Sequence, residues 1–479
     1  MVLERGAQRV IITSYFAVLG LIYVIAWLSP ALGMYRDDGV YLLTARALAS
    51  GHALPQTKFP PLWPAILALF TLISAQPQWL KIAPLLSTAG WLLLTRRLLL
   101  RMGATANGAL LMVALTAASP TILFFATNLM AEPLFGLLAT ACLLMLLDDR
   151  AVAAGVLAGL ATLTLSAGAA LIAACILTLA IRRRFRSGLI FTAIAVVITA
   201  PWFGWSLADG NHFSTNILTS LAANEKLVVL FRNSISIVSA PYDLLSGFNN
   251  TLAIVATSLV FGWSLIMRRQ LVPDLFAAFF CLMVLGRAEP PHRLLGAILP
   301  LLLWIVWRVF QNMQRREALA AAVLVAALLP LWADATRIPA TRTAGFFEAS
   351  GQVSNNWSEM QKLFAAIRSD TPPDAVLLAN LDPVFSFYTG RKTVRGFSPN
   401  GYALYYAQTP TLVTPDQLLT AIRQADVSFV IETPDRDYAE APLFHRTVDA
   451  LERGGILEPV STPGLPADYR LLRVTRTSF

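Results

Sequence analysis

The sequence has few charged residues for its length. Asp, Glu, Lys and Arg make up 14% of its 479 residues, against roughly a quarter in soluble domains. Hydrophobic residues make up 56%, and the mean hydropathy is +0.61. This composition excludes an ordinary soluble globular protein. Runs such as the apolar segment 10–32 are long enough to cross a bilayer, and they predict a polytopic membrane protein.

Cysteine and histidine are also scarce. Cys142, Cys175 and Cys281 lie inside apolar runs, and the four histidines are scattered along the chain. Neither residue type has the spacing of a zinc site, so we interpret the cysteines as small packing residues. The first apolar run has no small-residue cleavage site close behind it, and we expect no cleaved signal peptide.

Basic residues outnumber acidic residues and occur in short clusters. The net charge is +9, and the clusters lie at 96–101, 182–186, 268–269 and 308–316, between apolar runs. This placement is typical of membrane proteins that keep arginine and lysine on the cytoplasmic side. It argues against nucleic-acid binding and predicts that these clusters face the cytoplasm.

The apolar runs predict an α-helical protein of about eleven transmembrane helices, with a cytoplasmic N-terminus and a C-terminus outside. Run 61–75 is short and interrupted by prolines, so we expect a re-entrant or interfacial helix inside an outer segment, 33–78. Residues between 206 and 250 are expected in an outer loop that holds Asp243. The expected spans are 10–32, 79–95, 106–125, 132–147, 151–166, 168–181, 188–206, 250–267, 272–286, 294–310 and 318–334.

The composition changes after Asp334, where charge becomes nearly balanced and prolines become frequent. We therefore predict a transmembrane domain over 1–334 and a small α/β domain over 335–479, outside the membrane. Helical spacing at 355–370 precedes a strand-like segment at 375–380. Thr414 is expected to be the N-cap of a second helix that is again followed by a strand. Segment 469–475 reads as a closing strand.

Two adjacent aspartates, Asp37 and Asp38, open a run with helical spacing just after the first predicted span. One interpretation is helix capping, since aspartate at a helix start accepts hydrogen bonds from free N–H groups and suits the helix dipole. Two aspartates exceed the needs of one cap, however. An ionised carboxylate beside an acceptor hydroxyl or amine is also what a general base requires.

A further acid, Glu132, lies where an outer loop enters a span at Pro133. An acid in this position can serve the helix start alone, where proline is also favoured. As a second carboxylate at the same membrane face, it could orient an acceptor, bind a sugar or share a divalent metal, Mg or Mn, with Asp38. No Asp-x-Asp motif stands beside these two acids in support of a metal.

Cations gather in the outer loops as well. Lys58 precedes the stiff segment "FPPLWP", and "RAEPPHRLLGAILPLLL" brings Arg287, His292 and Arg293 to the outer end of a span. Lys58 alone could be an interfacial lysine. The two arginines oppose the positive-inside bias, and guanidinium groups bind phosphate oxygens well. Together with the acids, they predict a site that binds a phosphate while a carboxylate handles a proton.

These motifs resemble integral-membrane glycosyltransferases of the GT-C superfamily. The resemblance rests on the aspartate pair, with Tyr41 and Ala45 on the helix after it, and spans most of the chain. It is nearest to protein O-mannosyltransferase-type enzymes (glycosyltransferase family 39) and lipid A aminoarabinose transferases. The other matching segments are "KFPPLWP", "MAEPLF", "APWFGW", "HRLLGAILPLL" and "TPPDAVLLAN…FYTGRKTV".

The resemblance implies inverting transfer of a hexose or pentose from a polyprenyl-phosphate donor lipid to a protein, lipid or cell-envelope glycan. The reaction would take place at the outer face of a bacterial cytoplasmic membrane. Asp37 or Asp38 would be the base, and Glu132 would be the second-loop acid. Lys58 and Arg293 would contact the lipid phosphate. The full substrate-binding set would be Tyr41, Lys58, Arg287, His292 and Arg293.

One departure keeps other functions open. Relatives often have an arginine in a turn of the form "LTR–small–x–G", where this chain has "LTLSAG" with Leu165. A catalytically inactive, lipid-binding member is therefore one alternative. A transporter or lipid flippase is another. Those proteins tend to have internal repeats and ionisable residues near the bilayer midplane, whereas this sequence has no convincing repeat and its polar residues cluster at one face.

Overall fold

The computed structural model describes residues 5–29, 32, 37–52, 59–208, 223–246, 271–287, 292–310, 328, 357–397, 413–434 and 440–475. The chain forms two compact units. One comprises Met1–Leu28 and Thr44–Thr336, and the other comprises Ser29–Leu43 and Arg337–Phe479. The segment that carries the two aspartates thus belongs to the same unit as the C-terminal residues.

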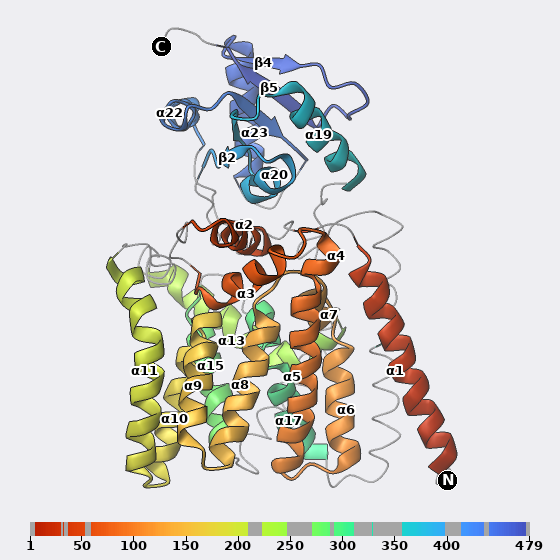
Figure 1. The fold of residues 1–479 in the computed structure, drawn as a ribbon, viewed down its shortest axis with the longest axis vertical. Helices are drawn as coiled ribbons and strands as arrows, with labels where there is room; N and C mark the ends of the chain where they lie inside the picture. Colours follow the sequence, from red (N-terminus) through yellow and green to blue (C-terminus); the bar gives the residue numbers. More distant parts are fainter. Residues whose placement is uncertain are drawn as a thin grey trace. The chain divides into compact units, whose positions relative to one another are not determined.

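The first unit is helical in its described residues (Figure 1). Its neighbouring long helices run roughly side by side, and α2 (Asp37–Ala49) begins in the second unit and ends in the first. The other helices are α1 (Arg5–Trp27), α3 (Leu62–Thr71), α4 (Pro77–Leu80), α5 (Ile82–Arg101), α6 (Ala106–Ala117), α7 (Pro120–Thr127), α8 (Glu132–Leu147), α9 (Ala151–Thr164), α10 (Gly168–Ile181), α11 (Phe185–Ala208), α13 (Ala223–Ser246), α15 (Leu271–Leu285), α16 (His292–Gly296) and α17 (Leu299–Phe310).

Two of the basic clusters lie at one end of this bundle. Arg101 at the end of α5 pairs with Asp148, which follows α8, and Arg184 before α11 pairs with the next residue, Asp149. The two ion pairs therefore join the ends of α5, α8 and α10. Because α8 runs toward this end and finishes just before Asp148, Glu132 at its first residue lies at the opposite end of the bundle.

Small residues allow the closest helix contact. A Cβ on Gly155 of α9 would lie 2.8 Å from the backbone oxygen of Phe191 in α11, and one on Gly159 would lie 2.9 Å from Ile198. Glycines four residues apart on one helix face let two backbones approach, which is common between membrane helices. Helix α11 therefore packs directly on the backbone of α9.

By length and composition, α11 is the one single helix in the described part of the chain that could cross a membrane. Helices α6 and α7 meet the same criterion as a pair bent by 65°. The bend comes at Ser119–Pro120, because proline lacks the N–H that would continue the first helix. The predicted continuous span 106–125 is therefore wrong in this detail, and the predicted span 294–310 is likewise divided between α16 and α17.

The predicted outer loop between 206 and 250 contains a helix where it is described, and the side of the membrane on which it lies stays a prediction. Helix α13 occupies Ala223–Ser246 and includes Asp243. Charged residues, among them Lys226 and Arg232, interrupt its apolar positions, so no continuous run reached the length of a span. Predicted span 250–267 and nearly all of 318–334 lie outside the described residues, and the total of eleven spans stays a prediction.

The second unit contains a five-stranded sheet in the order β2-β1-β3-β5-β4. Strand β1 pairs in parallel with β2 and β3, while β5 is antiparallel to β3 and β4. The strands are β1 (Val376–Leu378), β2 (Lys392–Val394), β3 (Phe429–Glu432), β4 (Leu457–Val460) and β5 (Arg470–Val474), and the helices are α19 (Trp357–Asp370), α20 (Asp382–Thr389), α22 (Pro415–Ala425) and α23 (Ala441–Arg453).

Alternating strand residues divide this unit into two apolar cores. Leu377 and Leu471 face a core with α19 and α20, whereas the next residues along, Leu378 and Leu472, face a core with α22 and α23. Successive strand side chains point to opposite faces, so helices cover both sides of the sheet. Thr414 caps α22 through a capping box with Gln417, which confirms the predicted N-cap.

Candidate functional site

Glu132 is the first residue of α8 and is fully buried. The turn before it is held by two side chains. Trp63 of α3 donates from Nε1 to the backbone oxygen of Leu129 at 2.8 Å, and Asn128 donates from Nδ2 to that of Phe124 at 3.0 Å. The "FPPLWP" segment therefore contributes a tryptophan that fixes the approach to Glu132.

Arg293 of α16 forms an ion pair with Glu132. Its Nε donates to Glu132 Oε1 at 2.8 Å across a sequence separation of 161 residues. The Glu132 side chain is 0% exposed and that of Arg293 is 38% exposed. A buried carboxylate needs such a partner. The structure thus brings together two of the predicted site residues.

The second carboxylate oxygen of Glu132 has a different environment. Within the described part of the chain, Oε2 is buried and has no hydrogen-bond partner. An ionised carboxylate has about four lone-pair sites, and a buried acceptor left unused is costly. This oxygen is suited to accept a hydrogen bond from a hydroxyl or an amine brought by a ligand.

Arg287 follows the end of α15, and its backbone is held by a residue that the sequence did not point to. Asn233 of α13 is buried, and its Nδ2 donates to the backbone oxygens of Leu285 at 2.9 Å and Arg287 at 2.7 Å. Asn233 thereby satisfies backbone acceptors at the helix end. It was missed because α13 itself was expected to be a loop.

Lys58 and the side chain of His292 lie outside the described residues, and their roles stay predictions. Leu165, which stands where relatives often have arginine, is half-buried between α9 and α10. Since α9 runs from the Asp148–Asp149 turn, Leu165 lies at the same end of the bundle as Glu132.

A small cavity lies about one helical turn along α8 from the Glu132–Arg293 ion pair. Its lining includes Gly136 and Ala297, each four residues after a member of the pair, and its volume is about 10 Å³. That is room for roughly one water molecule. Thr95 also lines the cavity, and its hydroxyl has no partner among the described residues. The cavity is too small for a sugar.

Asp37, Asp38 and Tyr41 occupy the start of α2, in the segment that belongs to the second unit. Asp38 and Tyr41 are buried, whereas Asp37 is partly exposed. Oδ1 of Asp38 accepts a hydrogen bond from the backbone N–H of Gly39 at 2.9 Å. Both carboxylates lie in the first helical turn, where the dipole favours negative charge.

The metal set predicted from the sequence, Asp38 and Glu132, stays a prediction. One Glu132 oxygen already accepts from Arg293. No group of three or more His, Cys, Asp and Glu side chains that could hold a metal occurs in the described ranges. We derive no step through Mg or Mn.

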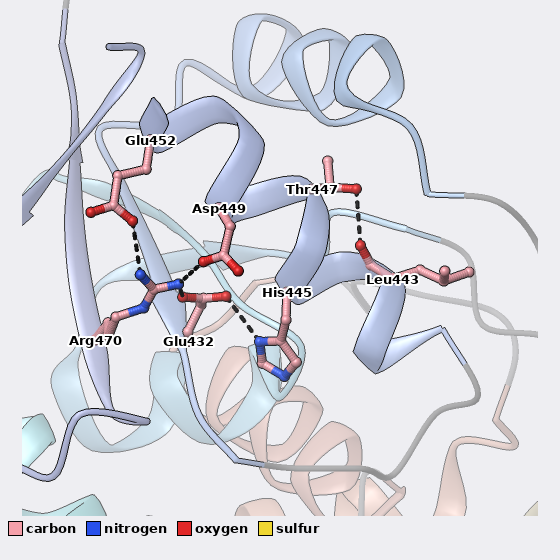
Figure 2. Close-up of polar contacts among 7 residues, drawn as sticks. All are labelled: Glu432, Leu443, His445, Thr447, Asp449, Glu452 and Arg470. Atoms are coloured by element: carbon pink, nitrogen blue, oxygen red, sulfur yellow. Dashed lines mark hydrogen bonds and ion pairs between the residues drawn. The ribbon is translucent and has the colours of Figure 1, made fainter. Parts of the chain in front are cut away.

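A second polar cluster, shown in Figure 2, ties α23 to the sheet. Arg470 of β5 donates to Glu452 at 2.8 Å and to Asp449 at 2.6 Å, and it also pairs with the buried Glu432. Burial lowers the pKa of Arg470, but these carboxylates outweigh that effect and raise it. His445 lies 2.9 Å from Glu432. The cluster joins α23, β3 and β5 and is interpreted as structural.

By sequence, no family model and no curated protein matches the chain. By structure, it is similar to ArnT from Cupriavidus metallidurans bound to undecaprenyl phosphate, with a TM-score of 0.58 and 15% identity over 97% of this chain and 98% of that one. The chain shares its fold with this protein. The apo state of the same ArnT matches with a TM-score of 0.50 and 14% identity over 98% of both chains.

Within this fold, the described candidate residues form two groups. The first unit holds the Glu132–Arg293 pair and the helix end at Arg287, and the second unit holds the start of α2. The first group offers an unused buried acceptor beside a partly exposed guanidinium. The second offers a partly exposed carboxylate beside a buried one.

Proposed function

We propose that the chain is a membrane glycosyltransferase that takes a sugar from a polyprenyl-phosphate lipid. A fold alone does not fix a function, so the Glu132–Arg293 pair carries the proposal. The two residues come from motifs that resemble those of glycosyltransferases, and they meet in a buried ion pair. Further support comes from the likeness to ArnT bound to undecaprenyl phosphate.

Arg293 is proposed to contact the phosphate of the donor lipid. A planar guanidinium can bind a carboxylate along one edge and a phosphate along another, and the Arg293 side chain is partly exposed. Lys58 and Arg287 are proposed as further phosphate contacts. Cations placed on the phosphate stabilise the negative charge that it gains as the sugar leaves.

Asp37 is proposed to be the general base. It accepts a proton from the acceptor hydroxyl or amine, whose oxygen or nitrogen forms a bond to the anomeric carbon. The bond between that carbon and the phosphate oxygen breaks, the lipid phosphate keeps the electron pair, and the configuration inverts. Asp37 is preferred to Asp38 because it is partly exposed, whereas Asp38 is buried against the N–H of Gly39.

Glu132 and Asp38 have supporting roles in this proposal. Glu132 Oε2 accepts a hydrogen bond from a substrate hydroxyl, which would satisfy its buried lone pairs. Asp38 holds the start of α2, and Tyr41 and His292 belong to the substrate-binding set. The acceptor is a protein, lipid or envelope glycan at the outer face of a bacterial cytoplasmic membrane.

The test uses full-length protein in membrane vesicles with undecaprenyl phosphates that carry a radiolabelled pentose or hexose. A cell-envelope fraction supplies the acceptor, and sugar transfer is followed as release of undecaprenyl phosphate. Asp37→Asn should lower kcat by about 10²–10⁴-fold, the usual contribution of a general base. Asp38→Asn should lower it by about tenfold, because Asn can still accept from the N–H of Gly39.

Binding of undecaprenyl phosphate, with undecaprenol as the headgroup control, separates chemistry from affinity. Both aspartate variants should bind the phosphate lipid like the wild type. Full turnover in Asp37→Asn would remove the base assignment. Movement of the labelled lipid across the vesicle, with no transfer to the envelope fraction, would favour a flippase instead.

A further inference from the structure

One side chain of the second unit binds both backbone groups of a residue that lies between α1 and α2 in the sequence. The hydroxyl of Tyr388, in α20, accepts from the N–H of Leu32 at 2.9 Å and donates to the oxygen of Leu32 at 3.0 Å. Leu32 is also buried. Tyr388 and Leu32 are 356 residues apart and belong to the same compact unit.

The position of the Tyr388 hydroxyl is set by the core of this unit. Its ring stacks on Phe364 with 4.8 Å between centroids, and it meets Trp357 edge-on at 5.1 Å. Its backbone oxygen accepts from Arg368 at 2.7 Å. All three neighbours belong to α19. Helix α19 therefore restrains the ring of Tyr388 on one side. Its hydroxyl in turn holds the backbone of Leu32 in place and is a fixed point for that part of the chain.

This fixed point lies close in sequence to the proposed base. Asp37 comes five residues after Leu32, a span of at most about 17 Å for an extended chain. Measured from Trp27, where α1 ends, ten residues would allow about 34 Å. When Leu32 is held, Asp37 can therefore lie at most about 17 Å from a fixed residue, which is half the reach that the chain would allow from Trp27.

We propose that Tyr388 is a positioning residue that anchors Leu32 and thereby restrains the segment bearing Asp37 and Asp38. The inference rests on the proposed function for its catalytic consequence, but the anchor itself does not. It assigns the C-terminal unit a task in transfer: it holds the chain that leads to the base. Catalytic groups lose much of their effect when they are displaced by about 1 Å, so loss of the anchor should appear in kcat.

The first measurement is hydrogen–deuterium exchange in the full-length protein. Tyr388→Phe keeps the ring and removes only the hydroxyl. Exchange of the Leu32 amide should then accelerate about tenfold or more, because two hydrogen bonds are lost. Ser386→Ala is the matched control, since it removes a hydroxyl from the same helix, two residues away. Unchanged Leu32 exchange in Tyr388→Phe would overturn the anchor.

The second measurement is sugar transfer by the same variants. Tyr388→Phe should lower kcat by about tenfold with the KM for the donor lipid unchanged, while Ser386→Ala behaves as the wild type. Faster exchange with wild-type kcat would overturn the positioning role. A wild-type protein that transfers no sugar would overturn the proposed function and this catalytic role, yet the exchange result would still decide on the anchor.

Discussion

The ion pair between Glu132 and Arg293 should stabilise the folded protein, and the same two residues are proposed to contact the substrate. Glu132 is fully buried, and the guanidinium of Arg293 lies 2.8 Å away. Removing one member of a buried pair usually costs about 3–5 kcal/mol, whereas removing both costs much less. The Arg293 side chain is 38% exposed. Solvent therefore screens its attraction to Glu132, and the stabilisation is smaller than in a fully buried pair.

We expect Arg293→Ala to destabilise the protein by about 1–3 kcal/mol, because it leaves a buried carboxylate unpaired. The double variant Glu132→Gln/Arg293→Ala should be more stable than Arg293→Ala alone, since Gln carries no charge. Thermal unfolding in detergent measures both. A double variant less stable than either single variant would show that the pair does not govern stability here.

At the same scale, the sequence pointed to residues that carry charge but not to residues that contact backbone. Glu132 and Arg293 were singled out because charges at span ends are rare. Trp63, Asn233 and Tyr388 act through carbonyl or N–H groups far away in sequence. Such contacts need no complementary residue type at the other end, so they leave no pattern in a single sequence.

Among the helices, the contact between α5 and α8 is tight enough to predict a steric effect. A Cβ on Gly136 would lie 2.5 Å from a ring atom of Trp91, and Trp91 is almost fully buried. We expect Gly136→Ala to destabilise the protein by about 1–3 kcal/mol, as overpacking usually does. The measurement is again thermal unfolding in detergent.

Gly204→Ala is the matched control for this contact. Gly204 also lies within a long helix, α11, but a Cβ there meets nothing within 4 Å. Alanine favours helix by up to about 1 kcal/mol over glycine, so Gly204→Ala should leave the unfolding temperature unchanged or raise it. Equal losses in both variants would contradict the close packing of Trp91 on α8.

Several helices could be predicted because their apolar runs are uninterrupted. The apolar helices α8, α9 and α10 begin and end within two residues of the predicted spans. The amphipathic α13 was missed because charged residues break its apolar run, and the divisions at α6–α7 and α16–α17 were missed because hydropathy does not detect a bend. Short elements such as α20, β2 and β4 offer too few residues for any period to be recognised.

For the whole molecule, composition predicted a helical part and a smaller α/β part, but not the path of the chain between them. The segment Ser29–Leu43 lies early in the sequence, yet it belongs to the compact unit formed by the C-terminal residues. Only tertiary contacts, such as that between Leu32 and Tyr388, reveal this. A domain boundary based on composition divides the sequence into consecutive parts, so it cannot assign an early segment such as Ser29–Leu43 to the C-terminal unit.

The orientation of the chain in the membrane is a prediction for the molecule as a whole. Arginine clusters near Asp148 and Asp149 should face the cytoplasm, and the unit with the sheet should face outward. Two exposed sites test this without removing any basic residue: Asn107, next to the cluster 96–101, and Ala365 on α19. Each is changed to cysteine in the full-length protein.

A membrane-impermeant maleimide should label Ala365→Cys in intact spheroplasts, and it should label Asn107→Cys only after the membrane is opened. The wild type gives the background, which should be low because Cys142 and Cys175 are buried and Cys281 is only partly exposed. If only Asn107→Cys were labelled in intact spheroplasts, the topology would be the inverse of the predicted one. The proposed base would then act at the cytoplasmic face. The arginine clusters near Asp148 and Asp149 would face outward, and the positive-inside rule would not account for them.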